Sequence, residues 1–231
     1  MKRTLRFAAW LAVAAAGVFL AVQLSYLARV WWYRDHDPQA TSFMHARLDQ
    51  LRERAPQAKL RHEWVPYERI STSLKRAVVV AEDSRFVDHE GFDWDAIERA
   101  REKNRRKGHV VAGGSTISQQ LAKNLFLSAS RTPWRKGQEA LITVMIENVM
   151  DKRRILEIYL NVIEWGDGVF GAEAAARHYF HASAASLGPE AAARLAAMVP
   201  NPRFYDRHRN TAWLERRTRT ILARMPLAEL P

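Results

Sequence analysis

Residues 74–91 read LKRAVVVAEDSRFVDHEG, and they decide the fold class. Within them, Leu74, Val78 and Ala81 recur at helical spacing, which predicts a helix whose buried face leads into Glu82. The same spacing marks two later apolar faces: Ile117, Leu121 and Leu125, and Ile155, Leu156, Tyr159 and Leu160. Strand-like alternation is scarce and the sequence shows no internal repeat. The sequence therefore predicts a mostly α domain.

The amino-acid composition limits which classes of function are possible for this chain. The chain of 231 residues carries 36 Lys+Arg against 25 Asp+Glu, a formal net charge of +11. This length suits one domain of ordinary size, and 48% hydrophobic residues are enough for a core. The absence of cysteine excludes disulfides, Cys-ligated zinc, iron–sulfur clusters and thiol catalysis. The basic excess indicates a polyanionic partner: nucleic acid, an anionic membrane or a phosphorylated substrate.

The N-terminal segment distinguishes between these partners. Residues 7–28 carry no charge and follow Lys2, Arg3 and Arg6. A run of about 22 apolar residues is long enough to cross a hydrocarbon core of about 30 Å as a helix. A cleaved signal peptide is the alternative, because residues 14–16 are three alanines. The apolar run continues past them, however, and this favours an uncleaved anchor.

The basic N-terminal end places that end in the cytoplasm and the globular part outside the membrane, where nucleic acid is not an expected partner. The predicted organisation is a cytoplasmic tail at 1–6, a transmembrane anchor at 7–28, a linker at 29–66 with some helix around 45–54, and a globular domain at 67–231. Within this domain, Pro189 opens an Ala-rich helix that extends to Met198.

Glu82 begins the first cluster of chemically active side chains, at the end of the apolar run. A carboxylate at the end of a buried helix is partly desolvated, which raises its pKa toward the range of a general base. A solvated helix end with a capping Asp is the structural alternative. A metal site built from Glu82, Asp83 and His89 is a third interpretation, although their spacing matches no usual ligand motif.

Residues 113–124 read GGSTISQQLAKN and form the second cluster. Ser115 or Thr116 is expected to cap a helix, and Gln119 stands three residues after Thr116, as in a capping box. The free amides of such a helix start suit an anion, with Lys123 one turn further on. An ordinary capped helix accounts for the glycines and the cap but leaves the Gln-Gln and Lys-Asn pairs unexplained.

Two further clusters complete the pattern. Arg131 precedes Arg135, Lys136 and Glu139, of which Arg135 and Glu139 could simply pair on a helix surface at i and i+4. Residues 152–161 read KRRILEIYLN, with apolar positions typical of a core. Together the clusters place two acidic groups, Glu82 and Glu139, among several cations.

The order and spacing of the four clusters resemble the peptidoglycan glycosyltransferase family, over about residues 67–205. The matching positions are Glu82, Asp83, Phe86, His89 and Gly91; Gly113, Ser115, Thr116, Gln119, Gln120, Lys123 and Asn124; Arg135, Lys136 and Glu139; and Lys152, Ile155, Leu156, Glu157, Tyr159, Leu160 and Asn161. The family's last motif, paired arginines, matches 216–222 only loosely, which leaves the roles of Arg217 and Arg219 open.

The resemblance implies a lysozyme-like α-helical glycosyltransferase domain at 67–231 behind one transmembrane helix. It implies a monofunctional enzyme of the inner (cytoplasmic) membrane, with a periplasmic catalytic domain, that polymerises lipid II. Its expected partners are lipid II, the growing glycan strand, the membrane and other cell-wall synthases or division proteins. A divalent cation, Mg²⁺ or Mn²⁺, is the only cofactor expected, bound by unidentified residues, and no organic cofactor is expected.

The resemblance also assigns roles. Glu82 is expected to be the general base. Glu139 is expected to have a supporting role, either orienting the basic side chains or holding the cation or the sugar. The expected substrate-binding residues are Asp83, Phe86, His89, Ser115, Thr116, Gln119, Gln120, Lys123, Asn124, Arg131, Arg135 and Lys136. Of these, Asp83 and His89 are expected to hold the loop after Glu82 by hydrogen bonds.

Two rival functions share some of these features. A lysozyme-like lytic enzyme could use the same fold and a catalytic Glu, but it has no need of a phosphate-binding cluster. A non-catalytic cell-wall scaffold predicts loss of the chemical residues, which are all present. A separate basic run at 98–108 is a solvated helix face by default and, in a membrane-tethered domain, a candidate contact with anionic head groups.

Overall fold

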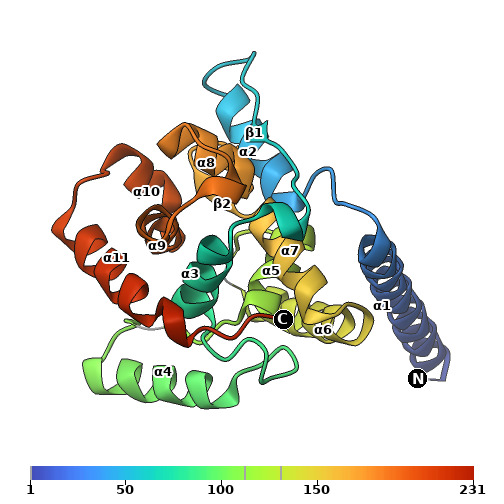
Figure 1. The fold of residues 1–231 in the computed structure, drawn as a ribbon. Helices are drawn as coiled ribbons and strands as arrows, with labels where there is room; N and C mark the ends of the chain where they lie inside the picture. Colours follow the sequence, from blue (N-terminus) through green and yellow to red (C-terminus); the bar gives the residue numbers. More distant parts are fainter. Residues whose placement is uncertain (1, 112, 131) are drawn as a thin grey trace.

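The computed structural model describes residues 2–111, 113–130 and 132–231. Its helices are α1 (Lys2–Asp35), α2 (Ser42–Arg52), α3 (Thr72–Glu82), α4 (Trp94–Lys107), α5 (Ile117–Phe126), α6 (Pro133–Val149), α7 (Lys152–Val162), α8 (Ala172–Phe180), α9 (Pro189–Met198), α10 (Pro202–Arg207) and α11 (Ala212–Arg224) (Figure 1). Short 3₁₀ turns lie at Tyr67–Arg69, Ala184–Ser186 and Met225–Leu227. The prediction of a mostly α fold is confirmed.

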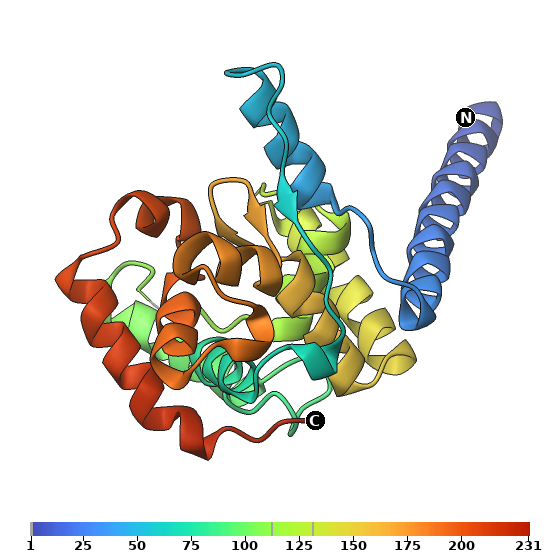
Figure 2. The same ribbon diagram turned by 45° about the horizontal axis from the view of Figure 1, so that its top comes forward.

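The core of the domain is a set of helices packed around α3 and α5 (Figure 2). Helix α3 packs against α9 and α11, and α5 packs against α6 and α7. The largest fully buried side chains include Trp165, Tyr159 and Phe86. Because α3 ends at Glu82 and α5 begins at Ile117 beside it, this packing determines where the candidate site lies.

Local sequence accounts for the helix ends near the site. The Ser71 hydroxyl caps α3 by accepting a hydrogen bond from the Leu74 amide at 3.1 Å. Helix α3 stops because Asp83 leaves the helical region, with φ −163° and ψ 77°. The predicted Ala-rich helix is present as α9, with Pro189 at its first position.

A small sheet, absent from the sequence prediction, joins the segments around α8. Strand β3 (Val169–Phe170) pairs in parallel with β1 (Arg61–His62) and antiparallel with β2 (Glu164–Gly166). The strands span only two or three residues, so period-2 alternation cannot reveal them in the sequence. The sheet ties the segment before the predicted domain start to the domain.

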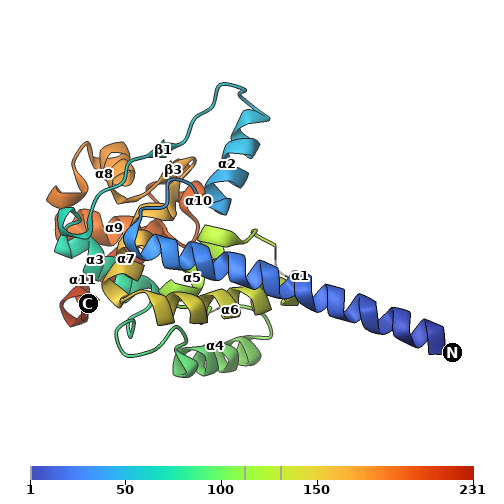
Figure 3. The same ribbon diagram turned by 90° about the vertical axis from the view of Figure 1, so that its right-hand side faces the viewer.

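The N-terminal helix is long and apolar enough to cross a membrane, over Arg3–Asp35, and fits a single-pass anchor. Figure 3 shows its C-terminal half running along α6 while its N-terminal end projects away from the domain. Val30 of this helix is completely buried in the domain core. The anchor helix therefore continues beyond the predicted end of the span at residue 28 and docks on the domain.

The predicted linker, residues 29–66, is largely built into the fold. It contains the expected helix as α2, slightly earlier than the predicted 45–54. Met44 and Val65 belong to the hydrophobic core, with 2% and 3% exposure. These side chains bury apolar surface that a free linker would leave in water.

Candidate active site

Glu82 is the last residue of α3, and its side chain is held by a short chain of hydrogen bonds. Gln120 Nε2 donates to Glu82 Oε2 at 2.9 Å. The Tyr159 hydroxyl donates to Gln120 Oε1 at 2.9 Å. Because Oε1 of the amide accepts from the tyrosine, its NH₂ group faces the carboxylate. The predicted base is thus positioned by α5 and α7 together.

Burial sets the acidity of Glu82. Its side chain is only 10% exposed, and desolvation raises the pKa of the carboxyl group. The hydrogen bond from Gln120 and the charges of Arg217 and Lys123 oppose this rise. The resulting group is a desolvated carboxylate with a strengthened affinity for a proton, which suits general-base chemistry.

Arg217, whose role the sequence left open, lies beside Glu82. Its Nη2 is 3.8 Å from Glu82 Oε1 and donates to the Ala81 carbonyl at 3.1 Å. Helix α11 brings this side chain to the end of α3, with which it packs. Arg219, two residues further along α11, is exposed. The loosely matching last motif therefore contributes one arginine to the site.

Asp83 points to the start of α5 rather than to the cleft. His89 Nε2 donates to Asp83 Oδ1 at 2.9 Å, and Asp83 Oδ2 accepts from the Ile117 amide at 3.0 Å. His89 Nδ1 accepts from the Gly91 amide at 3.1 Å. The hydrogen bonds expected to hold this loop are present, and they engage the side chains of both Asp83 and His89.

These contacts also bear on the metal interpretation of the first cluster. Asp83 and His89 bind one another, while Glu82 is directed to Gln120. Within residues 2–111, 113–130 and 132–231, no group of three or more His, Asp or Glu side chains is placed to hold a metal ion. The described residues thus form no metal cage around Glu82.

The start of α5 is a capping box, as predicted. Thr116 Oγ1 accepts from the Gln119 amide at 3.2 Å, and Gln119 Oε1 accepts from the Thr116 amide at 3.0 Å. Thr116 Oγ1 also donates to the Gly91 carbonyl at 2.6 Å. Asn124 donates to the Gln120 carbonyl at 2.8 Å. Three predicted substrate ligands, Thr116, Gln119 and Asn124, are thus mostly buried and serve the structure of the helix.

Phe86 is the clearest departure from the predicted site. Its ring is completely buried, below the Lys152 ammonium group at 4.7 Å from the ring centroid. Direct contact with substrate, expected from the resemblance, is therefore not available to it in this structure. An aromatic residue in a loop can be either a ligand or a core residue, and the sequence does not distinguish the two.

A cleft of about 490 Å³ opens beside Glu82. Ser115, Gln120, Trp213 and Arg217 are among the residues that line it. Ser115 is exposed, so its hydroxyl is the accessible one of the predicted serine and threonine pair. The cleft gives a bulky substrate access to the buried carboxylate.

Glu139 is the second buried acid, on α6, with 3% exposure. Arg135 pairs with it at 2.5 Å, and Lys136 pairs with its other oxygen. Thr132 caps α6, and Pro133 occupies its first position, so both cations lie in the first turn. Arg131 lies outside the described residues.

Lys123 connects the two acids electrostatically. It lies on α5, where burial lowers the pKa of its ammonium group. The charge of Glu139 is the largest opposing effect, that of Glu82 a smaller one, and Arg135 and Lys136 add to the lowering. Lys123, Arg135 and Lys136, with Glu139 paired to the last two, form the cationic region, and Lys123 is near enough to Glu82 to be affected by its charge. An anionic group between them would be stabilised by several cations.

Sequence reasoning missed a buried network beneath the loop. Glu147 on α6 accepts from Lys152 at 2.8 Å and also from Ser118. Lys152 donates in addition to the His89 carbonyl at 2.5 Å. Glu147 follows Glu139 by eight residues, just over two turns of α6, so both side chains can lie on one side of the helix. This spacing is the signal in the sequence that could have indicated the network.

The geometry defines a class of protein. A buried carboxylate at a cleft, followed by a cationic region, suits transfer of a sugar from a phosphate leaving group, and the apolar N-terminal helix fits a single-pass membrane anchor. The model of the transglycosylase family matches residues 48–226. The chain belongs to the transglycosylase family.

Relatives support the same assignment over the whole chain. A biosynthetic peptidoglycan transglycosylase of Chromobacterium violaceum is 63% identical over 94% of this chain and 96% of its own length. Proteins of the same name from Herminiimonas arsenicoxydans and Dechloromonas aromatica are each 59% identical over the full length of both chains.

Proposed function

We propose that the protein is a membrane-anchored peptidoglycan glycosyltransferase that polymerises lipid II, a disaccharide-pentapeptide on undecaprenyl pyrophosphate, into β-1,4-linked glycan strands. The observation that carries this proposal is the position of Glu82, buried at a cleft and oriented by Gln120, beside the cationic region at Glu139. The similarity to biosynthetic peptidoglycan transglycosylases supports the choice of substrate.

Glu82 acts as the general base in the proposed reaction. The 4-hydroxyl of the acceptor GlcNAc gives its proton to the Glu82 carboxylate while its oxygen attacks C1 of the donor MurNAc. The bond between C1 and the pyrophosphate oxygen breaks, the configuration inverts, and the pyrophosphate carries away the electron pair. Burial favours the protonated product of this step, because it raises the pKa of Glu82.

The cationic region stabilises the leaving pyrophosphate. Lys123, Arg135 and Lys136 supply positive charge where negative charge develops, and the sequence adds Arg131 to this set. Glu139 holds Arg135 and Lys136 in place through its two ion pairs. Its role is therefore to orient cations rather than to transfer a proton.

A divalent cation, Mg²⁺ or Mn²⁺, has no ligand cage among the described residues. The oxygens of Glu139 are occupied by Arg135 and Lys136, and Asp83 is occupied by His89. No described set of side chains could hold the cation by itself, so the expected divalent cation stays a prediction and the proposed mechanism contains no step through one.

We further propose that α1 holds the enzyme in the inner (cytoplasmic) membrane with its N-terminus in the cytoplasm and its domain in the periplasm. Three basic residues precede the apolar run, which supports this orientation. Other cell-wall synthases and division proteins are the protein partners that such a location would allow.

The test is polymerisation of lipid II by the detergent-solubilised full chain and by Glu82→Gln. Glutamine keeps the shape and cannot accept the proton, so we expect a loss of at least about 100-fold in kcat. Glu173→Gln is the matched control, because Glu173 is a buried carboxylate that accepts from the Ala184 amide outside the site. Full activity of Glu82→Gln would refute the base assignment.

The wild-type protein also distinguishes the proposed function from its two rivals, a lytic enzyme and a non-catalytic scaffold. A lytic enzyme would solubilise cross-linked cell walls without forming glycan strands from lipid II. A scaffold would do neither in the wild-type form.

A further inference from the structure

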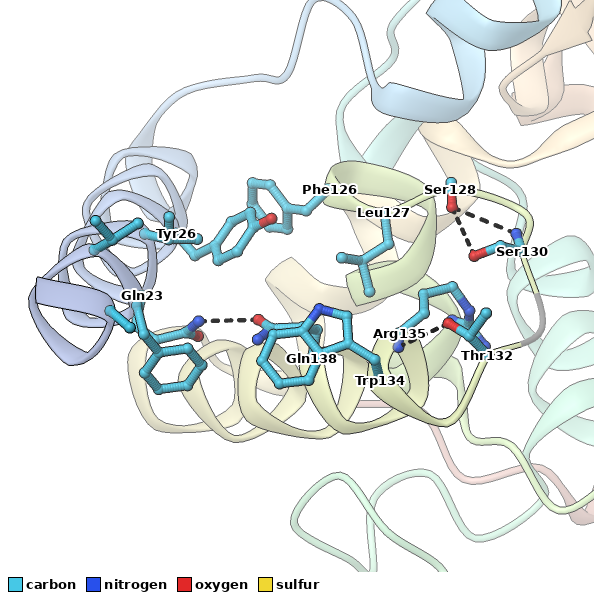
Figure 4. Close-up of a pocket in the computed structure, with 14 residues that line it drawn as sticks. Gln23, Tyr26, Phe126, Leu127, Ser128, Ser130, Thr132, Trp134, Arg135 and Gln138 are labelled. Carbon is cyan, nitrogen blue, oxygen red and sulfur yellow. Dashed lines mark hydrogen bonds between the residues drawn. The ribbon is translucent and has the colours of Figure 1, made fainter. Parts of the chain in front are cut away.

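A groove of about 640 Å³ runs between the anchor helix α1 and the globular domain (Figure 4), and of the residues that line it the proposed chemistry uses Arg135 alone. Val18, Phe19 and Val22 form part of its anchor wall. Gln23 Nε2 donates to Gln138 Oε1 of α6 at 3.0 Å and ties the two walls together. The groove therefore belongs to a fixed contact between the anchor and the domain.

Two aromatic pairs join the walls. The rings of Phe19 and Trp134 lie 6.1 Å apart between centroids, and those of Tyr26 and Phe126 lie 5.6 Å apart. Seven residues separate Phe19 from Tyr26, about 10 Å along a helix. With Leu127 also in the wall, the groove is an elongated apolar slot that follows the anchor.

The slot lies at the level of the apolar span. Its anchor residues fall within the helix that is long and apolar enough to cross a membrane. Trp134, at the start of α6, is 68% exposed beside them. A hydrocarbon chain can thus enter the slot from the lipid without crossing water, and burial of such a chain is favourable on apolar walls.

The slot borders the charged region of the site. Arg135 lines it and pairs with Glu139. Arg135 Nε is buried, and within the described part of the chain it has no hydrogen-bond partner. The charges of both Glu139 and Glu82 act on the ammonium group of Lys123. Lys123 therefore connects the Arg135–Glu139 pair at the slot with the base.

We propose that this groove binds the hydrocarbon chain of a polyprenyl pyrophosphate, with its phosphates at Arg135. The inference rests on the proposed function, because the donor substrate and the leaving lipid both carry this group. A bilayer phospholipid has only one phosphodiester charge to match the cations. The continuity between apolar slot and cationic region therefore favours the pyrophosphate lipid as the occupant.

The first test measures binding and needs no turnover. A long-chain polyprenyl pyrophosphate carrying a photoreactive diazirine near the middle of its chain is added to the full-length protein in nanodiscs. Crosslinked peptides are then located by mass spectrometry. We expect labels within residues 15–26 and 126–138, reduced at least fivefold by unlabelled polyprenyl pyrophosphate but not by phosphatidylglycerol. Labels spread evenly around α1, or equal competition by the phospholipid, would overturn the proposal.

A pair of variants gives the second test. Val22→Trp fills the groove, whereas Leu24→Trp adds the same side chain about 200° round the helix, at an exposed position outside the lining. We expect Val22→Trp to raise the KM for long-chain lipid II at least fivefold and to leave the KM for a short-chain analogue unchanged. Equal KM values for Val22→Trp and Leu24→Trp with the long-chain substrate would reject the groove.

The two proposals fail in different ways. If the wild-type protein takes the crosslink as expected but forms no glycan from lipid II, the proposed function fails and the groove assignment stands. If it polymerises lipid II while labels avoid the groove, only the groove assignment fails.

Discussion

Among the described residues, Arg217 is the cation that pairs with the buried Glu82 carboxylate, and its charge favours the ionised form of that group. The base works only when ionised, so activity should fall as pH drops through the pKa of Glu82. Burial raises this pKa, and Arg217 opposes the rise. Removal of the cation should therefore raise the pKa of Glu82 further.

We predict that Arg217→Gln shifts the acid limb of the kcat/KM profile to higher pH. The loss of activity should be largest on the acid side and smaller at alkaline pH, where Glu82 is ionised in both forms. Arg219→Gln is the control, since Arg219 is exposed on the same helix. A loss that is equal at every pH would show that Arg217 binds substrate without tuning the base.

The residues of the site differ in whether their position and contacts can be predicted from the sequence alone. Glu82 could be predicted because it ends an apolar helical run, which implies desolvation. The contact from Arg217 could not, because it spans 135 positions and depends on the packing of α11 against α3. Tyr159 was predicted correctly as a core residue, but its hydrogen bond to Gln120 requires the relative placement of α5 and α7.

At the scale of elements, caps decide where the helices of the site begin. Thr116 caps α5 and also donates to the Gly91 carbonyl, whereas Thr211 caps α11 by accepting from the Leu214 amide alone. Loss of a threonine cap costs about 1 kcal/mol. Loss of the additional bond leaves a buried carbonyl unpaired, at about 1–2 kcal/mol.

We predict that Thr211→Ala lowers the free energy of unfolding by about 1 kcal/mol and that Thr116→Ala lowers it by about 2–3 kcal/mol. Tryptophan fluorescence during urea unfolding in detergent measures both. Equal losses for the two variants would show that the bond to Gly91 adds no stability.

Helices with a clear apolar period or a capping signature could be predicted from the sequence, whereas the short strands could not. The capping box at Thr116 and the helix from Pro189 follow from local residue types. The sheet depends on pairing between β1 and β3, which lie about a hundred residues apart. Strands of this length carry no pattern of their own, so only the assembled fold reveals them.

At the scale of the whole molecule, the anchor is part of the domain rather than a tether. Sequence shows an apolar run that ends in charged residues, but not which side of the helix meets a partner. The structure buries Val30 in the core and pairs Gln23 with Gln138. The cationic region on α6 is thereby held beside the anchor helix.

The basic helix α4 is the surface that we expect to contact anionic head groups. It presents Arg101, Lys103, Arg105 and Lys107 to solvent, and within the residues that the structure describes none of these four forms an ion pair. Arg106 differs, because it pairs with Glu102. Each basic residue near an anionic surface contributes about 1 kcal/mol to binding.

We predict that Arg105→Gln with Lys107→Gln weakens binding of residues 36–231 to anionic vesicles by about 30-fold, the equivalent of about 2 kcal/mol. Cosedimentation with phosphatidylglycerol vesicles at low salt measures it. Both proteins lack α1, so the loss of anchor contacts affects them equally. Arg216→Gln with Arg224→Gln removes the same charge from exposed positions on α11. If the two pairs weaken binding equally, net charge explains the effect and α4 is not the contact surface. If neither pair does, these four residues do not contact anionic lipid.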